Sequence, residues 1–98
     1  MDVLKNWPQR YGEAFSEVCE VVRTVEIATR TRYGLAGEIY RVEVLQQATS
    51  GQCRMRYQVR ADGRWVEVNL GHAGPVSDPD AALGEALAAV ASCAHSAR

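Results

Sequence analysis

The sequence predicts a single α+β domain, residues 1–98, in which an antiparallel meander sheet of three to four strands packs against a C-terminal helix and an N-terminal helix. Three observations predict this fold. Residues 52–61 alternate between apolar and polar side chains, Asp62-Gly63 is typical of a two-residue hairpin turn, and an apolar stripe of helical period follows Asp78. A chain of 98 residues also has the usual length of one domain with one core.

The C-terminal helix is expected to begin at Pro79 and to run to about His95. Asp78 can cap it, Pro79 suits the first helical position because its φ is preset and it lacks an N–H, and Asp80 places negative charge at the positive end of the helix dipole. Apolar residues recur at helical spacing and predict the buried face: Leu83, Leu87, Val90 and Ala94.

Two hairpins are expected before this helix. The Asp62-Gly63 turn sets a register in which three inner-face pairs form: Val59 with Val66, Tyr57 with Val68, and Met55 with Leu70. A preceding strand, residues 39–47, turns Tyr40, Val42 and Val44 inward, and a loop over 48–51 sets Glu43 opposite Arg56. Opposite charges at that position favour this register over its neighbour, which would oppose Arg41 to Arg60.

Residues 8–31 support two interpretations. Apolar residues follow Pro8 at helical spacing, whereas residues 21–31 are rich in β-branched side chains, which prefer strands. We expect a helix over 8–20 and a strand over 21–30, with a turn at 33–37, which gives the order α-β-β-β-β-α. A helix that continues to Thr29 would instead give α-β-β-β-α. Double-stranded RNA-binding domains share that second order, but the acidic segment 77–80 stands where that family carries a basic cluster, so the likeness is one of element order.

Composition and charge are those of an ordinary globular protein. The net charge is −1, but residues 23–64 hold eight arginines against four carboxylates, and both ends of the chain are acidic. The N-terminal residues lack the features of a signal peptide, and no apolar run is long enough to span a membrane. Three widely spaced cysteines, Cys19, Cys53 and Cys93, favour a reducing compartment. We therefore expect a cytoplasmic protein.

The sequence contains no recognisable catalytic or metal-binding motif. Its cysteines and histidines are scattered singly, so we expect no metal site, no cofactor and buried apolar cysteines. The glycine-flanked loop 71–75 holds His72 ahead of a helix N-terminus and is the best location for an anionic ligand. A small enzyme with a site near His72 is therefore the third hypothesis, although Asp78 and Asp80 would repel a phosphate there.

The outer face of the predicted sheet could bind single-stranded nucleic acid. The expected register turns four arginines outward together with an aromatic residue, in the order Arg41, Arg54, Arg56, Arg60 and Trp65. Arg60 lies opposite Trp65, where a cation–π contact can form. Stacking on an aromatic ring and phosphate contacts from arginines are how sheets bind single strands, but Glu43 and Glu67 dilute the charge of this face.

The outward face of the C-terminal helix is short of charge. Glu85 is its only charged residue beyond the first turn, and a row of small residues, Gly84, Ala88 and Ser92, recurs every four positions, with His95 on the same side. Such a row allows a second helix to approach closely, either the N-terminal helix or the same helix of a second copy. The sequence therefore favours a non-catalytic protein-interaction module that forms a homodimer, with single-stranded nucleic-acid binding as the alternative.

Overall fold

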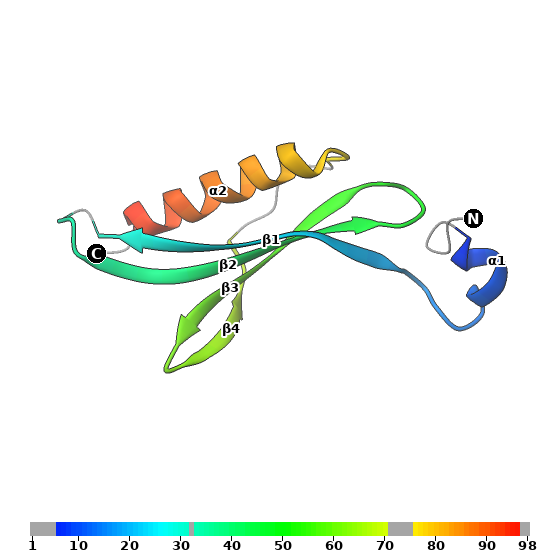
Figure 1. Ribbon diagram of the computed structural model, residues 1–98, viewed down its shortest axis with the longest axis horizontal. Coiled ribbons are helices and arrows are strands. Elements are labelled where there is room, and N and C mark those ends of the chain that lie inside the picture. The colour runs from blue at the N-terminus through cyan, green and yellow to red at the C-terminus, as the bar shows by residue number, and fades with distance from the viewer. Residues whose placement is uncertain (1–5, 32, 71–75, 97–98) are drawn as a thin grey trace.

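The computed structural model describes residues 6–31, 33–70 and 76–96, and it shows a four-stranded antiparallel sheet with one long helix on one face (Figure 1). The elements in chain order are α1 (Trp7–Tyr11), β1 (Cys19–Arg30), β2 (Ala36–Gln47), β3 (Cys53–Ala61), β4 (Arg64–Val68) and α2 (Pro79–Ser96). Neighbours in the chain are neighbours in the sheet, so the predicted meander and the α+β class are confirmed.

The strand registers follow the alternation of apolar and polar residues. Glu43 opposes Arg56 between β2 and β3, as the charge argument predicts. In the second hairpin Val59 opposes Val66 and Tyr57 opposes Val68, whereas the expected pairing of Met55 with Leu70 does not form because β4 ends at Val68. Asp62 and Gly63 have φ values of 53° and 78°, the two positive angles that a type I′ turn requires.

The N-terminal third has the predicted order of a helix followed by a strand, and β1 includes the expected residues 21–30, but the helix is much shorter than predicted. The helix expected over 8–20 is only the five residues Trp7–Tyr11, with Gly12 at its C-terminal cap, where the Gly12 N–H donates to the Pro8 carbonyl 3.2 Å away. A helix this short has hardly passed nucleation, whereas the β-branched residues that follow pair with β2 along a twelve-residue strand. The α-β-β-β-α order is therefore wrong, and α1 lies beyond one end of the sheet, away from α2 (Figure 1).

The core lies between the sheet and α2. Its buried residues come from β2, β3 and one side of the helix: Tyr40, Val42, Val44, Cys53, Tyr57, Ala82, Ala86 and Val90. We call this sheet face the inner face and the opposite one the outer face. Ala82 and Ala86 face the sheet and bring the helix close to it. The buried face of α2 is therefore rotated about the helix axis relative to the predicted apolar stripe. Leu87, which was expected to be buried, is 44% exposed, and Leu83 is only partly buried.

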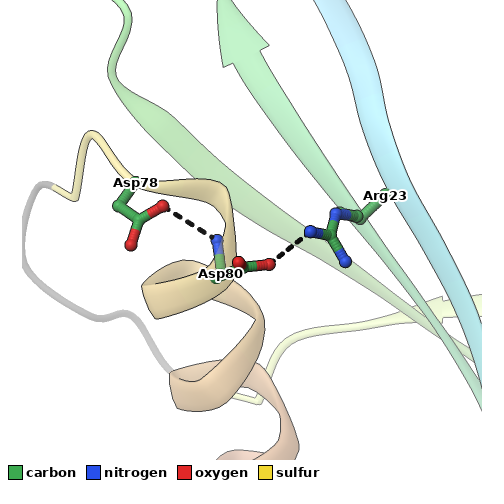
Figure 2. A network of polar contacts seen from close by, with 3 residues as sticks. All are labelled: Arg23, Asp78 and Asp80. Atoms are coloured by element: carbon green, nitrogen blue, oxygen red, sulfur yellow. Dashed lines mark hydrogen bonds and ion pairs between the residues drawn. The ribbon is translucent and has the colours of Figure 1, made fainter.

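The first turn of α2 is fixed by two acidic residues (Figure 2). The Asp80 N–H donates to the Asp78 carboxylate over 3.3 Å, so Asp78 is the predicted N-terminal cap and the helix begins at Pro79. The Asp80 carboxylate in turn accepts a hydrogen bond from the Arg23 guanidinium of β1. This ion pair joins the start of the last helix to the first strand.

No helix in the described part of the chain combines the length and the apolar composition that crossing a membrane needs.

The same substitution is expected to have opposite effects at two glycines. Gly63→Ala forces a side chain into the left-handed region and should lower the free energy of unfolding by about 1–2 kcal/mol. Gly84 lies in α2 with open space where a Cβ would be. Gly84→Ala should therefore raise the free energy of unfolding by up to about 1 kcal/mol, because alanine has the higher helix propensity. Urea unfolding of both variants measures the two shifts, and a stabilised Gly63→Ala chain would contradict the turn assignment.

Candidate functional site

The predicted nucleic-acid residues lie together on the outer face of the sheet. Arg41, Arg54, Arg56, Arg60 and Trp65 come from β2, β3 and β4, at positions that alternate with the inner residues. Helix α2 packs on β1, β2 and β3 from the other side. Within the described residues, no helix covers the outer face, so these side chains form its surface.

Trp65 is flanked by two guanidinium groups. The predicted contact with Arg60 is present, with the guanidinium carbon 5.7 Å from the ring centre. Arg41 is closer, at 4.1 Å, and it was not expected because it stands two strands away on β2. Gln58 lies on β3, the strand between Arg41 and Trp65. Its Oε1 is buried and accepts no hydrogen bond from a described residue. The long arginine side chain therefore reaches diagonally across β3 and covers a face of the Trp65 ring on which a nucleic-acid base could otherwise stack.

Carboxylates hold three of the four arginines on this face. Arg56 contacts Glu43 at 2.7 Å, Arg54 contacts Glu17 at 3.0 Å, and Arg41 contacts Glu26 at 3.9 Å. Glu43 faces Arg56 directly across the strands, Glu26 faces Arg41, and Glu17 reaches in from the segment that precedes β1. The positive charge that the arginine count suggests is thus largely balanced by neighbouring glutamates.

An open hollow of about 640 Å³ lies where β4 ends and β3 continues. Its polar lining comes from Arg54, Arg56, Glu67 and Asn69, and Leu45 and Tyr57 contribute apolar surface. The two guanidinium groups already have the ion pairs with Glu17 and Glu43. A ligand that used these arginines would therefore have to replace a carboxylate that the protein itself supplies.

The outward face of α2, which we define by its exposed residues Ala81, Gly84, Leu87, Ala88, Ala91 and Ser92, is the second candidate surface. The row of small residues is exposed as predicted, and Glu85 is the only charged residue beyond the first turn. His95 lies in the last turn of the helix, and its side chain falls outside the described part of the chain. Leu87 is the large apolar residue of this face, in contrast to its predicted place in the core.

One cluster of titratable groups is partly buried beside α2. The Tyr40 hydroxyl lies 3.4 Å from the Cys93 Sγ and 3.2 Å from a Glu38 carboxylate oxygen, to which it donates. The hydrogen bond with Cys93, together with burial, holds the pKa of Tyr40 well above its ordinary value. Burial likewise raises the pKa of the Cys53 thiol, and Asp78 adds to this shift. Both shifts favour the protonated forms of the Tyr40 hydroxyl and the Cys53 thiol.

The remaining predicted sites fall outside what the structure describes or outside any cluster. His72 and its loop, 71–75, lie outside the described residues. Among the described residues no three His, Cys, Asp or Glu side chains gather as metal ligands would. Cys19, Cys53 and Cys93 are all free thiols. Comparison with protein-family models, with curated proteins and with solved structures finds no match to this chain.

The Tyr40 cluster predicts a loss of stability at alkaline pH. The pKa of Tyr40 is raised in the folded state, whereas the unfolded chain titrates near pH 10, so stability is intact below about pH 10 and is lost as the pH rises beyond it. Between neutral pH and pH ~11, the free energy of unfolding measured in urea should fall less for Tyr40→Phe than for the parent protein. Tyr33→Phe, at a tyrosine that is 73% exposed, is the control and should keep the parent's pH dependence. An equal alkaline loss in all three chains would contradict this prediction.

Proposed function

We propose that this protein is a non-catalytic protein-interaction module that associates with a second copy of itself. The observation that carries the proposal is the outward face of α2, where Leu87 is 44% exposed among small uncharged residues. A helix face turned to water usually carries charged side chains, and a large exposed aliphatic residue on such a face is typical of a contact surface. The proposal requires no cofactor and no metal.

The position of Leu87 supports a contact between proteins rather than incomplete packing within one chain. Leu87 follows Asp80 and Leu83 at helical spacing, so the three residues share one flank of α2. Asp80 bonds to Arg23 of β1, and Leu83 and Val22 of β1 pack against the same buried cluster, so this flank faces β1. Arg23 and Val22 belong to the first strand of the sheet, which has no described strand on its other side. Leu87 is thus exposed at an open side of the molecule that another chain can reach.

The charge of the outer face favours a protein partner over nucleic acid. Binding to single strands depends on arginines free to contact phosphates and on an open aromatic face. Here Arg54 and Arg56 are paired with glutamates, and Arg41 stacks on Trp65. Phosphates would have to displace these partners.

The three free cysteines fit a reducing compartment, so we place the proposed module in the cytoplasm.

Light scattering coupled to gel filtration tests the association. At tens of micromolar, the parent protein should have about twice the 10.8 kDa mass of one chain. Leu87→Glu places a charge in the contact and should raise the dissociation constant by about tenfold or more, because a buried apolar residue near the centre of an interface carries much of its binding energy. Leu35→Glu makes the same change at a leucine that is 67% exposed in the β1–β2 turn, and it should leave the mass unchanged.

Two results would count against the proposal. A parent protein with the mass of one chain at these concentrations would remove self-association altogether. Equal effects of Leu87→Glu and Leu35→Glu would show that a general change in charge, and not the flank of α2, controls the mass. Circular dichroism of both variants establishes that they keep the parent's fold, which is expected because both leucines are exposed.

A titration with single-stranded oligonucleotides tests the alternative function. Because Arg41 already covers Trp65 and three arginines have carboxylate partners, we expect no salt-dependent change in tryptophan fluorescence. The matched variant Glu43→Gln releases Arg56 and should be the form in which any weak oligonucleotide binding first becomes measurable. Tight binding by the parent protein that weakens steeply with added salt would instead favour the nucleic-acid function.

A further inference from the structure

The first strand of the sheet is a long open edge. β1 has twelve residues and pairs with β2 on one side, and no described strand pairs with it on the other. Every second residue of such a strand directs its backbone N–H and C=O groups outward, where another strand can bind them. The opposite edge, β4, has only five residues. β1 is therefore the edge with room for an additional strand.

The middle of β1 is regular and both of its ends are not. Register shifts interrupt its pairing with β2 between Val21 and Arg23 and again between Ala28 and Arg30. Irregularities of this kind bend a strand and stop further pairing. The run from Arg23 to Ala28 thus remains as the part of the edge that can accept a partner. It presents Arg23, Val25 and Ile27 on the inner face and the alternate residues on the outer face.

We propose that a second copy of the chain adds to this run antiparallel, around a two-fold axis at Val25, so that the two sheets join into one of eight strands. This inference rests on the proposed self-association and names the surface that carries it. A two-fold axis normal to the sheet keeps both α2 helices on the same face of the joined sheet. Each residue of β1 then pairs with a residue of the second β1 whose side chain lies on the same face of the joined sheet.

Charge and length select this register among those that the run allows. Axes at Val25 and at Glu26 each keep five residues paired within the regular run, whereas axes at Thr24 or Ile27 keep three. An axis at Glu26 would oppose Glu26 to its own copy, and like charges directly opposite one another destabilise a strand pair. The axis at Val25 instead opposes Val25 to its copy and Thr24 to Glu26 of the second copy.

The surroundings of β1 fit this arrangement. Arg23 would oppose Ile27 of the second copy, but its guanidinium is turned to Asp80 on α2 and does not project across the edge. The flank of α2 that faces β1 carries Leu87, so the two exposed Leu87 side chains would face each other above the new strand pair. The free backbone edge and the exposed leucine thus lie on the same side of the molecule.

Disulfide cross-linking of two cysteine variants tests the register. Thr24→Cys and Glu26→Cys are each introduced, at exposed outer-face positions, into a Cys19→Ser chain, which removes the native thiol of β1. The proposed axis sets position 24 opposite position 26, so oxidised glutathione should cross-link a mixture of the two variants and should cross-link neither variant alone beyond the level of the Cys19→Ser parent. Intact mass identifies the mixed dimer because the two variants differ in mass.

The controls separate this inference from the function on which it rests. Gln52→Cys, also exposed but outside β1, should give only collisional cross-linking when mixed with Thr24→Cys. Cross-linking of Thr24→Cys alone, or of Glu26→Cys alone, to the level of the mixture would overturn the axis at Val25. A parent protein that has the mass of a dimer, with no cross-link in the mixture, would overturn the β1 edge and leave self-association standing. A parent protein with the mass of one chain would overturn both.

Discussion

The structure depends on a single helix that must bury the apolar face of four strands. An α-helix with its side chains is about 10–12 Å wide, and neighbouring strands are about 4.8 Å apart, so one helix covers two or three strands. α2 packs on β1, β2 and β3, and the hairpin that ends in β4 extends away from it (Figure 1). Val66 on β4 is accordingly 44% exposed although it lies on the inner face. The helix thus leaves the β4 end of the inner face without a cover from the described residues.

Local signals in the sequence were sufficient for the second half of the fold. Asp62-Gly63 predicted a turn with two positive φ angles, and the alternation that it joins predicted the pairs Tyr57–Val68 and Val59–Val66. Asp78 and Pro79 predicted the start of α2. In each case the residues that determine the conformation are adjacent in the chain or face one another across a two-residue turn, so their effect does not depend on distant parts of the protein.

The errors arose where distant contacts decide the outcome. Residues 12–20 carry a helical pattern, but the strand that follows gains its stability from β2, which no local window contains. Leu87 was predicted to be buried because it belongs to an apolar stripe of helical period, yet Ala82 and Ala86 let α2 approach the sheet with another face, which leaves Leu87 exposed. For the outer face the outward arginines and the contact of Arg60 with Trp65 could be predicted. The closer contact with Arg41 depends on the twist that brings a diagonal neighbour over the ring.

The position of α2 at the end of the strand order also affects how the protein is made. The four strands leave the ribosome before residues 79–96, so the meander can assemble from neighbouring hairpins while its inner face still lacks the helix that covers it. During that interval Tyr40, Val42 and Val44 are exposed to solvent or to a chaperone. The ion pair between Arg23 and Asp80 then joins one of the first strand residues synthesised to one of the first helical residues, so docking of α2 can begin with its N-terminal turn. Burial of the core thus has to wait until residues 79–96 have been synthesised.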